Sequence, residues 1–81
     1  MLPLSSLKVG EVGVVQDITG GFGFISRISA TGFTHNAEVT MLRNWKRGPV
    51  IVFIRDTQMA LGRGEASKIL VGPLAGGADG R

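Results

Sequence analysis

Glycine sets the organisation of this chain, because 13 of its 81 residues are glycine and they recur from Gly10 to Gly80. Glycine permits backbone turns that other residues disfavour, so this spacing predicts many turns joined by short strands. A chain of 81 residues holds one small core, which argues against a multi-domain enzyme or a transporter. The sequence has no cysteine, which excludes disulfides, thiolate zinc sites and thiol nucleophiles.

The positive charge lies mainly in the second half of the chain. The formal net charge is +3, and residues 41–71 alone hold six cations against two carboxylates. This excess favours an acidic partner surface, a nucleic acid or a membrane face. The sequence contains no apolar run of the roughly 18 residues that a spanning helix needs, and its start lacks a signal-peptide pattern. A cytoplasmic protein is therefore expected.

The first third of the chain predicts a strand followed by a helix. Residues 11–18 alternate, with Val12, Val14 and Ile18 expected on the buried face and Val15 on the outer face. Residues 22–30 then carry apolar side chains at helical spacing, which predicts a helix with its aromatic rings buried. Gly32 is expected to close this helix with Phe33 packed back on it.

The remaining residues predict four strands linked by short turns. These strands are expected over residues 38–43, 50–55, 58–61 and 68–71, with a hairpin loop over 44–49 and an irregular turn over 62–67. The unbroken apolar run 50–55 predicts a strand that is buried on both sides or lies in the middle of a small barrel. Residues 1–71 are thus predicted to form one mainly β domain, a small SH3-like barrel of about five strands with one inserted helix. An OB-like barrel stays open, and the glycine-rich residues 72–81 are expected to be a flexible tail.

The residues that catalysis would need are scarce. His35 is the single histidine and lies in a predicted turn, where Glu38 and Asp56 would orient it only by the accident of folding. Ligand spacing indicates no metal site, although Met41, Met59 and His35 can contact a soft metal. The glycine-rich residues 20–24 lack the lysine and hydroxyl residue of a phosphate-binding loop. We therefore predict no catalytic residue, no cofactor and no metal site.

The predicted hairpin loop concentrates residues that are typical of binding surfaces. Trp45 is the only tryptophan, and Arg43, Lys46 and Arg47 surround it. Tryptophan and arginine are over-represented at binding hot spots, so these four residues are the candidate partner-binding site. In the alternative interpretation, Trp45 folds back as a lid on the barrel, and the sequence favours neither.

One resemblance is to the cold-shock domain, an OB-fold binder of single-stranded nucleic acid. Residues 21–25, Gly-Phe-Gly-Phe-Ile, look like its first aromatic motif, and Phe33 and His35 look like its second. That resemblance implies that Phe22, Phe24, Phe33 and His35 form an exposed platform on which bases stack. Gln16 and Asp17 depart from the family, which usually has an aromatic residue and a lysine there.

A second resemblance, to the FeoA family of bacterial ferrous-iron uptake, covers nearly all of residues 7–71. Residues 10–18 are similar to that family's opening motif, and the most specific part is the ending Ala-Leu-Gly-Arg-Gly-Glu-Ala-Ser-Lys-Ile-Leu-Val at residues 60–71. Thr31, His35 and Asn36 depart from the family's helix end and its Pro-Gly turn. The helical spacing of residues 22–30 favours this family over the cold-shock domain, which needs a strand there.

The FeoA resemblance implies a non-enzymatic, cytoplasmic accessory protein without a cofactor. Its implied partner is FeoB, the membrane ferrous-iron transporter, contacted through protein–protein interaction. On this chain we expect the contact at Arg43, Trp45, Lys46 and Arg47, together with the outer side of the helix over residues 22–30. Self-association remains open.

Overall fold

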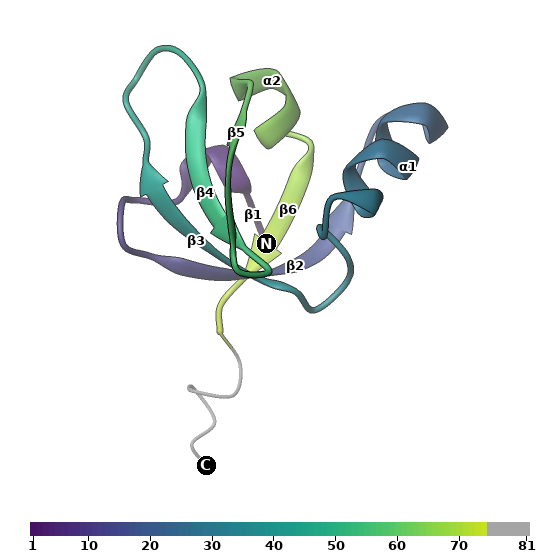
Figure 1. The fold of residues 1–81 in the computed structure, drawn as a ribbon, viewed down its shortest axis with the longest axis horizontal. Helices are drawn as coiled ribbons and strands as arrows, with labels where there is room; N and C mark the ends of the chain where they lie inside the picture. Colours follow the sequence, from purple (N-terminus) through teal and green to yellow (C-terminus); the bar gives the residue numbers. More distant parts are fainter. Residues whose placement is uncertain (75–81) are drawn as a thin grey trace.

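A computed structural model describes residues 1–74 as one curved antiparallel sheet with short helices at its margins (Figure 1). The strands are β1 (Leu2–Pro3), β2 (Val12–Ile18), β3 (Glu38–Arg43), β4 (Val50–Ile54), β5 (Thr57–Leu61) and β6 (Ile69–Gly72). The helices are the 3-10 helix η1 (Leu4–Ser6) and the α-helices α1 (Phe22–Ala30) and α2 (Arg63–Ala66). The hydrogen-bonded strand order is β1-β6-β2-β3-β4-β5. The prediction of a mainly β fold with a helix after the first long strand is confirmed.

Three short elements, β1, η1 and α2, escaped the sequence prediction. Leu2 and Pro3 pair with Val71 and Leu70, which adds a sixth strand to the five expected. The predicted irregular turn at residues 62–67 contains α2, whose first turn is closed by the Gly62 N–H donating to Glu65 Oε1 at 3.0 Å. Elements of two to four residues are too short to repeat the periods by which strands and helices are recognised in a sequence.

The expected facing of β2 is wrong at Val15. This side chain is only 1% exposed and belongs to the core, and Ile18, three residues later, is partly buried and packs against the core. Strict alternation would put these two residues on opposite faces, but the pairing of β2 with β6 shifts register between Val15 and Asp17. A β-bulge of this kind adds one residue to a strand and so reverses the facing beyond it.

The end of α1 follows the prediction, whereas its beginning does not. Gly32 has φ +113°, its N–H donates to the Ser29 carbonyl, and the Phe33 N–H donates to the Ile28 carbonyl, which is a complete Schellman end. Phe33 is fully buried in the core. Phe22, whose ring was expected to be buried, is 86% exposed because the first turn of α1 extends past the sheet (Figure 1).

Strand β4 is buried on one face only, so the first of the two alternatives for residues 50–55, a strand buried on both sides, is wrong. Val50, Val52 and Ile54 are buried, whereas Phe53 is 42% exposed. Although all its residues are apolar, β4 alternates between buried and more exposed side chains, because its outer face is open to solvent. The inward residues join a single apolar core that also includes Leu4, Ile28, Phe33, Met41 and Ile69.

The C-terminal strand β6 reaches Gly72, one residue beyond the end predicted for it. Most of the predicted flexible tail, residues 75–81, lies outside the described residues. Within residues 1–74, no helix has the length and apolar character needed to cross a membrane.

Candidate partner-binding surface

The four candidate residues lie together at the junction of β3 and β4. Arg43 is the last residue of β3, and Trp45, Lys46 and Arg47 follow in the connecting loop, residues 44–49. The Trp45 side chain is 62% exposed, and the Arg43 guanidinium carbon lies 5.8 Å from the centre of its ring. This exposure rejects the interpretation of Trp45 as a lid on the barrel. We call residues 43–49 the basic loop.

Two polar side chains hold the base of the basic loop in place. Asn44 Nδ2 donates to the carbonyl oxygens of Ser5, at 3.0 Å, and Leu7, at 2.7 Å. Arg63 Nη2 donates to Asn44 Oδ1 at 2.7 Å and also to the Trp45 carbonyl oxygen. The loop is thus tied to both the N-terminal segment and α2, while Trp45, Lys46 and Arg47 stay exposed.

Neither anchor was among the predicted site residues. Asn44 reaches residues 37 and 39 positions away in sequence, and Arg63 reaches a residue 19 positions away. No periodic pattern connects residues at such separations. The one available signal was that Arg63 belongs to the specific 60–71 segment on which the family resemblance rested.

Helix α1, whose outer side is the second predicted contact, also carries an aromatic residue beside cations. Phe24 is partly buried, and its ring centre lies 5.0 Å from Lys68 Nζ and 5.6 Å from the Arg27 guanidinium carbon. Arg27 also forms an ion pair with Glu65 of α2, with 3.3 Å between Nη2 and Oε2. Phe22 remains exposed at the start of the helix.

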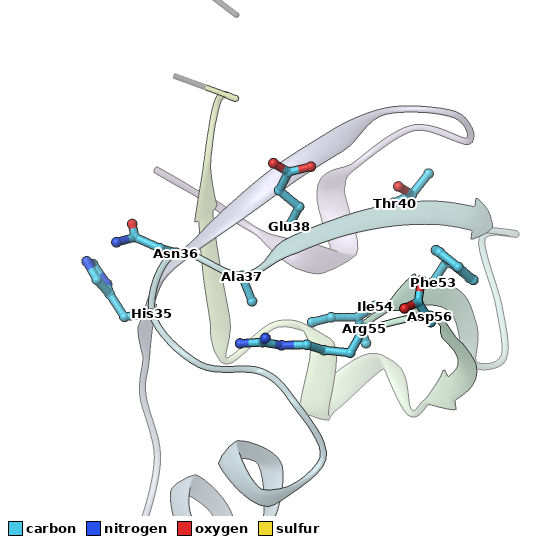
Figure 2. Close-up of a pocket in the computed structure, with 9 residues that line it drawn as sticks. All are labelled: His35, Asn36, Ala37, Glu38, Thr40, Phe53, Ile54, Arg55 and Asp56. Carbon is cyan, nitrogen blue, oxygen red and sulfur yellow. The ribbon is translucent and has the colours of Figure 1, made fainter. Parts of the chain in front are cut away.

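A shallow cavity of about 520 Å³ lies at the other end of the sheet, between the turn after α1 and the β4–β5 turn (Figure 2). We call it the turn cavity, and its lining is His35, Asn36, Ala37, Glu38, Thr40, Phe53, Ile54, Arg55 and Asp56. His35 Nδ1 lies 3.1 Å from the Gln16 carbonyl oxygen, and Arg55 Nη2 donates to Thr34 Oγ1 at 2.8 Å. The His35 and Arg55 side chains therefore contact the protein itself.

The structure does not assemble the metal contacts considered from the sequence. Figure 2 shows His35 and Asp56 on opposite sides of the turn cavity, with Glu38 on its rim between them. Residues 1–74 contain no cluster of three or more histidine, cysteine or acidic side chains suited to a metal ion. Met41, named as a contact for a soft metal, is fully buried in the core, so that expectation is wrong for this residue.

The stacking platform of the cold-shock interpretation does not form. Residues 22–30 are helical where that fold requires a strand. Phe33, one of the four expected stacking residues, has no exposed surface, whereas Phe22 is almost fully exposed. Side chains that differ so much in exposure cannot share one face for stacked bases.

Comparison with known proteins decides between the two resemblances. A family model described as the FeoA domain matches residues 2–73. This chain belongs to the FeoA family. It is 37% identical, over 71 residues that make up 88% of this chain and 85% of the relative, to a protein of Methanocaldococcus jannaschii provisionally named Fe(2+) transport protein A.

Solved FeoA structures share the fold. A crystal structure of an iron uptake regulatory protein, FeoA, matches with a TM-score of 0.82 and 30% identity, over 86% of this chain and 93% of that one. The zinc complex of Stenotrophomonas maltophilia FeoA, described as a prokaryotic SH3 domain protein, matches with a TM-score of 0.73 and 28% identity. That match covers 88% of this chain and 89% of the other, and the predicted SH3-like class is confirmed.

Proposed function

We propose that this protein is a cytoplasmic, non-enzymatic accessory of ferrous-iron uptake that binds the cytoplasmic part of a FeoB-type transporter through the basic loop. Membership of the FeoA family and the iron-transport names of its relatives support the role in iron uptake. The exposed Trp45 with its surrounding cations supports the choice of surface. This cluster is the single observation that carries the proposed contact.

The chemistry of the loop suits a protein partner with an acidic and partly apolar face. A tryptophan ring offers a large rigid contact area, and an arginine guanidinium binds carboxylates through two parallel hydrogen bonds. The anchors Asn44 and Arg63 hold the backbone under Trp45, which lowers the conformational entropy lost on binding. Such a pre-organised, projecting aromatic with charged neighbours has the composition of a binding hot spot.

The test is binding of the purified cytoplasmic domain of a FeoB-type transporter, measured by calorimetry and pull-down without membranes. We expect the Trp45→Ala, Arg47→Ala double variant to weaken binding by about thirtyfold or more, the loss typical of a truncated hot-spot residue. Both side chains are exposed, so the free energy of unfolding should be nearly unchanged.

A matched control comes from another exposed pair. Lys8 and Val9 are exposed, and Val9 is 62% exposed, the same fraction as Trp45. The Lys8→Ala, Val9→Ala variant removes one cation and one apolar side chain outside the basic loop, and it should bind as the unmodified chain does. Equal binding by the Trp45 and Arg47 double variant, with folding intact, would reject this surface.

A further inference from the structure

The basic loop is one part of a larger surface. Glu65 of α2 pairs with Arg27 of α1, and Arg63 of α2 donates to Asn44 of the basic loop, so contacts link all three elements. Figure 1 places α1, α2 and the loop between β3 and β4 at the same end of the molecule, away from the C-terminal end of the described chain. We call this surface, made of α1, residues 43–49, α2 and Lys68, the basic end.

The charged side chains are divided unevenly between the basic end and the rest of the molecule. The basic end holds six cations and one carboxylate, which are Arg27, Arg43, Lys46, Arg47, Arg63, Lys68 and Glu65. Its side chains therefore carry a net of five positive charges. The other charged side chains of residues 1–74 are Lys8, Arg55, Glu11, Asp17, Glu38 and Asp56, a net of two negative charges. The basic end is therefore the part of the molecule with a positive electrostatic potential, which attracts anionic surfaces.

Two exposed aromatic residues lie on separate elements of the basic end. Phe22 begins α1 and is 86% exposed, while Trp45 in the basic loop is 62% exposed. In Figure 1 the start of α1 and the basic loop project on either side of α2. Separated aromatic anchors with cations between them are typical of surfaces that rest on a bilayer, where rings enter the headgroup region and cations face lipid phosphates.

We propose that the basic end docks on the surface of an anionic lipid bilayer, with Phe22 and Trp45 inserted at headgroup depth and the intervening cations facing the phosphates. A bilayer fits better than a nucleic acid, because the aromatic residues lie on separate projections and do not form a continuous platform for successive bases. It also accounts for Phe22, which the transporter contact through the basic loop does not use. The docking goes beyond the proposed function and does not depend on a protein partner.

The experiment uses the full chain with vesicles that contain no protein. Vesicles of phosphatidylcholine alone are compared with vesicles of phosphatidylcholine and phosphatidylglycerol, by co-sedimentation and by fluorescence. Trp45 is the only tryptophan, so its emission reports directly on the basic end. We expect binding to the anionic vesicles only, a blue shift of Trp45 emission, and weaker binding as salt rises from about 0.1 M to about 1 M.

Variants separate the two contributions. Phe22→Ser should weaken vesicle binding by about tenfold through loss of ring insertion. Lys46→Glu should weaken it by at least about fivefold, since each cation near an anionic surface contributes roughly that factor. Val9→Ser and Lys8→Glu, exposed positions outside the basic end, serve as matched controls and should have smaller effects than their counterparts.

Three results would overturn the proposal. One is the absence of binding to anionic vesicles at low salt, and another is binding that Phe22→Ser leaves unchanged. The third is a preference for single-stranded DNA or for the transporter's soluble domain that depends on Phe22 while vesicles stay unbound. Because the vesicles hold no transporter and the transporter assay holds no bilayer, the two proposals fail separately.

Discussion

The basic end and the turn cavity lie at opposite ends of one sheet and differ in what their side chains do. At the basic end, the anchors Asn44 and Arg63 donate hydrogen bonds to backbone carbonyl oxygens. The side chains of Trp45, Lys46 and Arg47 are left exposed to solvent. At the turn cavity, His35 and Arg55 are exposed as well, but their side chains contact the protein's own oxygen atoms.

Among the non-glycine residues of the described chain, backbone strain occurs at the turn cavity and not at the basic end. The three non-glycine residues with positive φ, among residues 1–74, are Asn36, Arg55 and Asp56, and all three line the turn cavity. Arg55 and Asp56 have φ of 53° and 61° between the paired residues Ile54 and Thr57, as a type I′ hairpin turn requires. For Arg55 and Asp56 the strain thus has a structural cause in the hairpin, and the comparison teaches that a cavity bordered by strained residues need not be the binding surface.

The largest effect on the free energy of unfolding is expected from adding a side chain at Gly32, beside the turn cavity. A Cβ at this position would lie 2.9 Å from Arg55 Cγ, and its φ of +113° is unfavourable for any side chain. Gly32→Ala should lower the free energy of unfolding by about 2 to 3 kcal/mol, measured by urea denaturation.

Two further variants divide that loss into its causes. Gly23→Ala, inside α1 with open space around it, should instead stabilise the protein by about 1 kcal/mol through helix propensity. Gly32→Ala combined with Arg55→Ala removes the close contact but keeps the unfavourable φ. A Gly32→Ala protein as stable as the Gly23→Ala protein would contradict the Schellman end described for α1.

An intermediate effect is expected at the anchor of the basic end. Asn44→Ala removes three hydrogen bonds from a partly buried side chain, so the free energy of unfolding should fall by about 2 kcal/mol. The basic loop should also become more mobile, which the fluorescence anisotropy of Trp45 would report. Lys46→Ala, in the same loop but at an exposed position, is the control, and equal stability of the two variants would mean that Asn44 does not hold the loop.

The smallest effect sharpens the comparison at the turn cavity. Asp56→Gly places glycine at the second central position of the type I′ turn and should stabilise the protein by about 0.5 kcal/mol. Binding to the transporter domain and to vesicles should not change. Thr57→Gly, one residue later in β5, should instead destabilise by about 1 kcal/mol. A loss of binding in the Asp56→Gly variant, with folding intact, would indicate that the turn cavity takes part in binding.

Much of the fold could be read from local patterns. The end of α1 at Gly32, the hairpin between β3 and β4, and the cluster around Trp45 all depend on residues within a few positions of one another. Local patterns did not show that Val15 faces the core, because this depends on a register shift between β2 and β6. They also did not show that Phe53 is exposed, because this depends on whether another element covers the outer face of β4. Within the candidate site, composition pointed to the four residues, but it did not show that they are exposed.

The sequence carried the FeoA resemblance in motifs such as residues 60–71, and the comparison with known proteins decided the family. By itself the sequence determined the mainly β class and the position of the basic residues along the chain, because these follow from local spacing and composition. Only the tertiary structure decided that Phe22 is exposed, that Asn44 and Arg63 anchor the basic loop, and that α1, α2 and this loop share one end. The physical reason is that exposure and anchoring depend on contacts such as Asn44 with Ser5, which join residues 39 positions apart. Contacts between residues so far apart in sequence form only when the strands pack together around the core, and no local periodicity predicts them.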